Sequence, residues 1–103
     1  MGPVPKGVRL KISGKRNCVG ERVRQLREGQ GITQDALCAR LALETGEWAD
    51  AGTKWVPSKI EIHRIEVGVR AVLDLEVIAL AKVLGVDPCE LLTSPQIPGD
   101  TKG

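Results

Sequence analysis

Residues 58–68, SKIEIHRIEVG, decide the fold class. Ile60 and Ile62 alternate along the stretch as residues of a β-strand would, whereas Ile62 and Ile65 repeat at the spacing of a helix. Gly68 is well placed to end a helix, because glycine readily adopts the left-handed conformation found at helix ends. We therefore expect a helix that ends just before this glycine, and a strand is the alternative.

The sequence on both sides of this stretch predicts four more helices. Asn17 is expected to cap a first helix that begins there or at Cys18 and ends near Glu28. Thr33 is expected to cap the second helix. The fourth and fifth helices are expected at 74–84, capped by Asp74, and from Asp87 and Pro88 onward. The side chains expected on the buried helix faces are Val19, Val23, Leu26, Leu37, Cys38, Leu41, Ile62, Ile65, Val77, Ile78, Ala81 and Leu84.

The connection at 44–57 breaks the helical rhythm and holds both aromatic residues of the chain, Trp48 and Trp55. Because no other aromatic side chain is available to finish the core, we expect at least one of them to be buried. Pro57 is expected in the first turn of the next helix, where its missing N–H costs nothing.

The composition excludes several classes of protein. With 103 residues, 42% of them hydrophobic, the chain suits one small domain with a core. One histidine, and three cysteines without a C-x-x-C pair, argue against a zinc site, a disulfide framework and an enzyme. We therefore expect no metal, cofactor or small-molecule ligand. Reduced cysteines favour the cytoplasm, and neither a membrane span nor a signal peptide is predicted.

The charge is unevenly distributed, although the net charge is only +2. Residues 1–30 carry eight basic and two acidic groups, and residues 31–103 carry seven basic and eleven acidic groups. A basic front end suits contact with a polyanion, and a solvated tail is the alternative. We expect a flexible basic arm at 1–16, a helical domain at 17–92 and a flexible tail at 93–103.

Four motifs in order resemble the lambda-repressor-like helix-turn-helix family, in particular the Cro/repressor (XRE-type) regulators. These are GERVRQLR at 20–27, GITQ at 31–34 followed by Leu37, IHRIEVG at 62–68, and the segment 75–92 with AKVLGV at 81–86. The resemblance implies an all-α, five-helix fold with a helix-turn-helix. The chain departs from the family in its long connection between the second and third helices, which either lengthens the second helix or inserts a loop.

The resemblance also implies functional residues in a protein that binds double-stranded DNA. The implied base contacts are Lys59, Ile60, Glu61 and Arg64. The residues expected to contact the sugar-phosphate backbone of the DNA are Thr33, Gln34, Ser58, His63, Arg70 and Arg16. In the family, the positions of Arg27 and Glu66 form an internal salt bridge.

The residues of helix 58–67 support the same interpretation independently. At 100° per residue, Ile60 and Val67 point away from the buried side, with His63 and Arg64 beside them and Lys59 to one side. An arginine can bond guanine bidentately, and an isoleucine can contact thymine methyls in the major groove. The alternative is that Ile60 packs under the long connection.

The expected function is that of a small transcriptional regulator, a repressor, acting as a homodimer on a pseudo-palindromic operator. The dimer contact is expected at the end of the fourth helix and the fifth helix, near Leu91 and Leu92. The alternative is a protein-interaction module, such as an antitoxin or an operon partner binder, that uses Trp48 and Trp55 as interface anchors.

Overall fold

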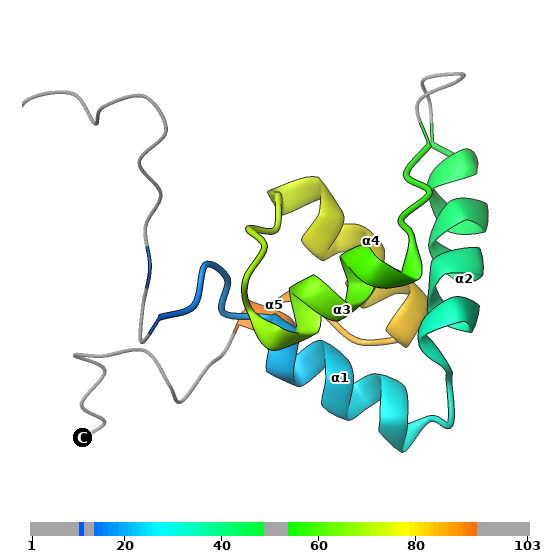
Figure 1. Cartoon of the computed structure of the whole chain (residues 1–103). Coiled ribbons are helices and arrows are strands. Elements are labelled where there is room, and N and C mark those ends of the chain that lie inside the picture. The colour runs from blue at the N-terminus through cyan, green and yellow to red at the C-terminus, as the bar shows by residue number, and fades with distance from the viewer. Residues whose placement is uncertain (1–10, 12–13, 49–53, 93–103) are drawn as a thin grey trace, which may run out of the picture.

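The computed structural model describes residues 11, 14–48 and 54–92, and its elements are five helices. They are α1 (Gly20–Gly29), α2 (Gln34–Gly46), α3 (Lys59–Val67), α4 (Asp74–Leu84) and α5 (Pro88–Leu92), as Figure 1 shows. The all-α class expected from the sequence is confirmed, and the strand alternative for 58–67 is wrong. Most of the expected arm, the tail at 93–103 and part of the long connection lie outside the described residues.

The helix boundaries follow local side-chain chemistry. Thr33 Oγ1 accepts a hydrogen bond from the Ala36 N–H (3.0 Å) at the start of α2. At the start of α3, Ser58 and Glu61 form a capping box in which each side chain accepts from the other residue's N–H, both at 3.2 Å. Gly68, with φ of +88°, ends α3 in the left-handed conformation. The boundaries at Thr33 and Gly68 agree with the sequence pattern.

Three expected helix starts are corrected. Pro57 lies just outside α3, because Ser58 takes the capping position. In α4 the capping residue is Leu73, and Glu76 rather than Asp74 accepts the Leu73 N–H. Helix α1 begins at Gly20, three residues after Asn17, whose Oδ1 still accepts from the N–H groups of residues 19 (3.0 Å) and 20 (2.7 Å).

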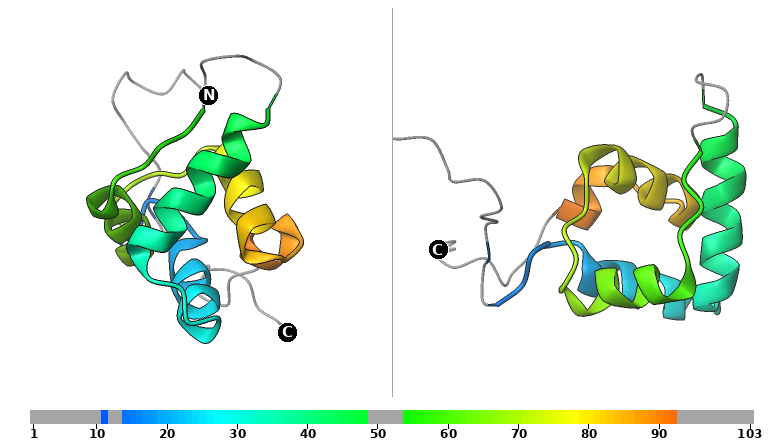
Figure 2. Two further views of the ribbon diagram at one scale, coloured as in Figure 1. Left: turned by 90° about the vertical axis from the view of Figure 1, so that its right-hand side faces the viewer. Right: turned by 45° about the horizontal axis from the view of Figure 1, so that its top comes forward.

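The core lies where α1 packs against α3 and α2 packs against α4, with α5 closing one end against α4 (Figure 2). It is built from aliphatic side chains. One assignment to a buried face is corrected, because Ile78 is 40% exposed. The core positions that the sequence interpretation missed in α4 are Ala79 and Leu80, which are both fully buried. The buried apolar side chains are Val19, Val23, Ile32, Leu37, Leu41, Ile62, Ile65, Val77, Ala79, Leu80, Ala81, Leu84 and Leu91.

The beginning of α1 and the last turn of α3 approach each other very closely. A Cβ atom on Gly20 would lie 1.9 Å from the Ile65 carbonyl oxygen, so only glycine fits there. The amide of Asn17 donates to the carbonyls of Ile65 (3.1 Å) and Arg70 (2.8 Å). These contacts fix the C-terminal end of α3 on the domain.

Helix α2 continues to Gly46, which is beyond the break expected at residue 44. Thr45 is buried in its last turn, donates from Oγ1 to the Leu41 carbonyl (2.8 Å) and accepts from the Trp55 N–H (2.7 Å). The long connection therefore combines a lengthened helix with a segment, 47–58, whose far end is tied back to that helix.

Candidate nucleic-acid interface

One side of α3 carries exposed apolar and cationic side chains together. Ile60 is 63% exposed and Val67 is 43% exposed, and Lys59, His63 and Arg64 are exposed beside them. The alternative that Ile60 packs under the connection is therefore wrong. Large apolar side chains on a polar helix surface are characteristic of interaction sites when they occur as a group.

The opposite side of α3 is held by a buried ion pair. Arg27 Nε lies 2.6 Å from Glu66 Oε2, and Nη2 donates to Oε1 (3.0 Å). Arg27 Nη1 also donates to the Ile32 carbonyl (2.8 Å). The hydrogen bond to Glu66 raises the pKa of Arg27 despite its burial. The pair that the family resemblance implied is thus present, and it joins α1 to α3.

Glu66 also binds Gln34, a residue that is expected to contact the DNA backbone. Gln34 Nε2, at the first position of α2, donates to Glu66 Oε1 (3.0 Å), while Thr33 is engaged as the cap of that helix. Both residues therefore lie at the N-terminus of α2, next to α3, in orientations set by neighbouring residues.

Two further expected DNA contacts, Glu61 and Arg70, also have protein partners. Glu61, an expected base contact, accepts from the Ser58 N–H with Oε1 and lies 3.4 Å from Arg70 Nη2 with Oε2. Arg70, an expected phosphate contact, makes a bidentate pair with Glu76 at 2.9 and 3.0 Å. The hydrogen bonds to Glu76 raise the pKa of Arg70, whose guanidinium remains a cation between two carboxylates.

The basic residues just before α1 lie at the end of α3. The Arg16 N–H donates to the Gly68 carbonyl (2.8 Å), and the side-chain stem of Lys15 covers Gly68, where a Cβ would come within 2.9 Å of its Cδ. Arg16 is exposed. Sequence reasoning treated this segment as part of an arm and could not see that its last residues pack on α3.

A polar hollow of about 470 Å³ lies between α1, α3 and the start of α2. Its wall includes His63 and Val67 from the exposed side of α3, so it adjoins that surface. Lys15 and Arg24 also contribute to the wall, and sequence reasoning did not name either as a site residue. The full lining is Lys15, Glu21, Arg24, Arg27, Glu28, Gln34, His63, Glu66 and Val67.

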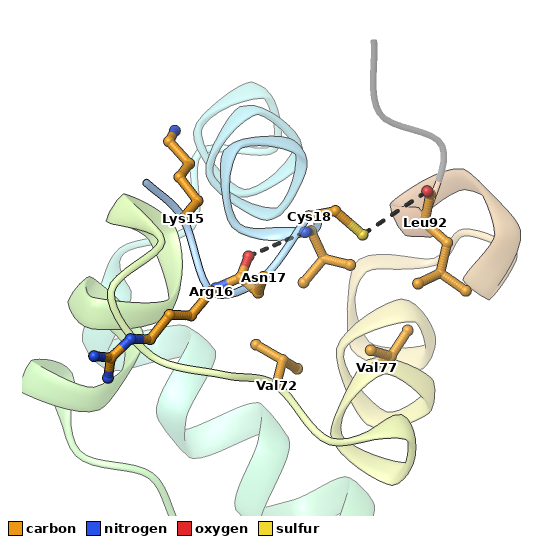
Figure 3. Close-up of a pocket in the computed structure, with 8 residues that line it drawn as sticks. Lys15, Arg16, Asn17, Cys18, Val72, Val77 and Leu92 are labelled. Carbon is orange, nitrogen blue, oxygen red and sulfur yellow. Dashed lines mark hydrogen bonds between the residues drawn. The ribbon is translucent and has the colours of Figure 1, made fainter. Parts of the chain in front are cut away.

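A second hollow of about 270 Å³ opens where the segment before α1 meets α4 and α5 (Figure 3). Cys18, Val72, Val77 and Leu92 point toward it, while the charged ends of Lys15 and Arg16 point away. Cys18 Sγ lies 4.0 Å from the Leu92 carbonyl oxygen. No cluster of potential metal ligands occurs within residues 11, 14–48 and 54–92, and this hollow is mainly apolar.

Both tryptophans pack against the core but are only half-buried, whereas at least one was expected to be buried. Trp48 Nε1 donates to Glu44 Oε2 (3.2 Å), and the Arg70 guanidinium lies 5.8 Å from the Trp55 ring centre. The expected dimer surface is corrected at Leu91, which is fully buried and cannot contact another molecule.

No family model, curated protein or solved structure matches this chain. In the described part of the chain, no helix has the length and apolar character needed to cross a membrane.

Proposed function

We propose that this protein binds double-stranded DNA sequence-specifically and acts as a small transcriptional repressor, with α2 and α3 as its helix-turn-helix. The exposed side of α3 would read base edges in the major groove. The observation that carries the proposal is the 63% exposure of Ile60 beside Lys59 and Arg64. A groove-reading helix needs such a surface, because guanine edges accept from cations and thymine presents a methyl group.

The rigid attachment of α3 supports this proposal. Ile62 and Ile65 are fully buried, and Glu66 is held by Arg27 and Gln34. A helix that discriminates bases must present its side chains in a fixed register. The resemblance of the sequence to XRE-type regulators points in the same direction.

The decisive experiment is a binding-site selection from random duplex DNA with the wild-type chain and with Arg64→Ala. The wild type should enrich a motif. Loss of one bidentate base contact should relax the preference at one position per half-site, by about 1–3 kcal/mol of discrimination. The matched control is Arg22→Ala, which removes the same side chain from an ion pair with Glu90 that links α1 to α5.

Two outcomes would contradict the proposal. If Arg64→Ala enriches the wild-type motif with equal strength, α3 is not the reading helix. If the wild type enriches no motif, DNA reading itself is wrong. Interaction with a protein through Trp48 and Trp55, the alternative function, would then be the next hypothesis to test.

We also propose that two copies bind a pseudo-palindromic site, because one such helix covers only a short half-site. With Leu91 buried, the contact at the end of α4 and α5 would depend on Leu92, which is 49% exposed. Analytical ultracentrifugation with the selected duplex should give two chains per site. A strict 1:1 complex would overturn the dimer.

A further inference from the structure

Arg70 occupies a position in which one guanidinium contacts the capping glutamates of two consecutive helices. Glu61 is the third residue of α3 and accepts the Ser58 N–H, and Glu76 is the third residue of α4 and accepts the Leu73 N–H. Arg70 Nη2 lies 3.4 Å from Glu61 Oε2, and its two terminal nitrogens bond both oxygens of Glu76.

A third element meets the same guanidinium. The Trp55 ring, from the far end of the long connection, lies 5.8 Å from the Arg70 Cζ atom, within the range of a cation–π contact. Arg70 Nη1 also donates to the Ala71 carbonyl (2.9 Å), so each of the two terminal nitrogens contacts two acceptors. The side chain is only 24% exposed. An arginine committed in this way is poorly placed to grip a phosphate.

We infer that Arg70 is a positioning residue for the DNA-reading face. Through its contacts with Glu61, Glu76 and Trp55 it fixes the position of the first turn of α3 relative to α4 and the connection. This inference rests on the proposed function, because the face it positions is that of Lys59, Ile60 and Arg64. It replaces the direct phosphate contact expected from the sequence.

The charge of Glu61 gives the inference its mechanism. Its side chain is 38% exposed on the first turn of α3, near the surface proposed to meet DNA. Paired with Arg70, the carboxylate is neutralised and held against the capping position. Without Arg70 it would repel the phosphates and would be free to leave its place.

A double-mutant cycle in DNA affinity separates positioning from direct contact. Arg70→Gln should weaken binding to the selected site by roughly tenfold, within the range of coupling between residues in contact. In this inference Glu61 is held by Ser58 and Arg70 and does not contact a base, so the base contact expected from the resemblance is withdrawn. Glu61→Gln keeps an acceptor for the Ser58 N–H and removes only the charge. It should therefore have a small effect in the wild type but should restore most of the affinity in Arg70→Gln. If Arg70 instead binds phosphate, the two effects add and Glu61→Gln gives the same small change in both backgrounds, which would overturn the inference.

The conservative variant Arg70→Lys provides a second test that distinguishes positioning from phosphate binding. A lysine keeps the charge that a phosphate contact needs but cannot bridge two carboxylates as a planar fork does. Positioning predicts that Arg70→Lys loses affinity nearly as Arg70→Gln does, whereas wild-type affinity in this variant would contradict positioning. Affinities are measured at a temperature where thermal melts show every variant folded, and Arg22→Gln, which breaks the pair with Glu90, serves as control.

NMR of the free protein tests the register without DNA. Arg70→Gln should shift the amide signals of Ser58 and Leu73 and the indole signal of Trp55, while Arg22→Gln should leave all three in place. Unchanged signals in Arg70→Gln would overturn the inference even if the wild type binds DNA. If the signals shift but no duplex is bound by the wild type, the register stands and the proposed function fails.

Discussion

The inner and outer sides of α3 differ in how many contacts with the rest of the chain hold their side chains in place. On the inner side, Ile62 and Ile65 are fully buried and Glu66 has three hydrogen bonds from two residues. On the outer side, Ile60 and Arg64 project into solvent, and no polar partner of Arg64 occurs within the described residues. The same nine-residue helix thus separates residues that the fold needs from residues that the fold leaves free for a partner.

The largest effect should come from Glu66→Ala on the inner side. Removing one partner of a buried ion pair leaves the other charge unpaired, at a cost of roughly 3–5 kcal/mol. Arg27 and Gln34 would both lose their acceptor. Urea unfolding of the wild type and the variant measures the loss, and Glu47→Ala, which truncates an exposed glutamate, is the control. A cost below about 1 kcal/mol, as for a surface pair, would mean that the inner side is not held by this ion pair.

The next largest effect is the difference between an isoleucine-to-alanine substitution on the inner side of α3 and the same substitution on its outer side. Ile65→Ala opens a cavity in the core and should cost roughly 2–5 kcal/mol of unfolding free energy. Ile60→Ala removes the same atoms from the surface and should change that free energy by no more than about 0.5 kcal/mol. It should instead weaken the DNA preference at a thymine. Equal destabilisation by the two variants would show that Ile60 is packed in solution and would remove it from the reading face.

The sequence predicted local features of α3 well, because the groups that decide them are neighbours in the chain. The cap at Ser58 and the stop at Gly68 are both within-turn interactions, although the pattern placed Pro57, one residue before the cap, in the first turn. In α4 almost every position is apolar, so several stripes fit the helical period. The pattern therefore placed Ile78 inside, although Leu80 is the buried residue.

Features that depend on tertiary contact could not be read from the sequence. Arg70 stands after a glycine in a turn, and nothing near it indicates that Glu61 and Trp55 will meet its guanidinium. The pattern places Lys15 in an arm, yet its side chain covers Gly68. The pairing of Arg27 with Glu66 was expected through the resemblance to a family, because the two residues are far apart in the chain.

A smaller effect should appear as a dependence of stability on pH. Burial acts to raise the pKa of Glu76, but the hydrogen bonds from Arg70 and the Leu73 N–H outweigh it and leave the pKa below its usual value. A lowered carboxylate pKa adds stability above the pKa of the unfolded chain, and this part is lost as the pH falls through the folded value. Glu76→Gln should therefore be less stable than the wild type at neutral pH, and the difference should shrink in acid.

Unfolding of both proteins across pH 2–7, a range spanning about two units around the usual glutamate pKa, measures this difference. The control is Glu47→Gln, at an exposed glutamate on the other side of the connection. A difference between Glu76→Gln and the wild type that stays constant with pH would show that the ionised pair does not contribute. The contacts of Arg70 would then hold by packing alone.

The smallest effect concerns Arg16, which lies at the end of α3 without belonging to either side of it. Its N–H holds the Gly68 carbonyl, while its side chain is exposed. Arg16→Gln keeps the backbone contact and removes only the charge. If that charge meets a phosphate, affinity should fall equally for all duplexes, and the slope of log K against log salt should become shallower by about 0.9.

Arg64→Ala, in contrast, should change which sequence is preferred. Titrations of the selected and a scrambled duplex between low and high salt separate the two behaviours. An unchanged slope in Arg16→Gln would confine the DNA contact to the outer side of α3 and the helix ends beside it.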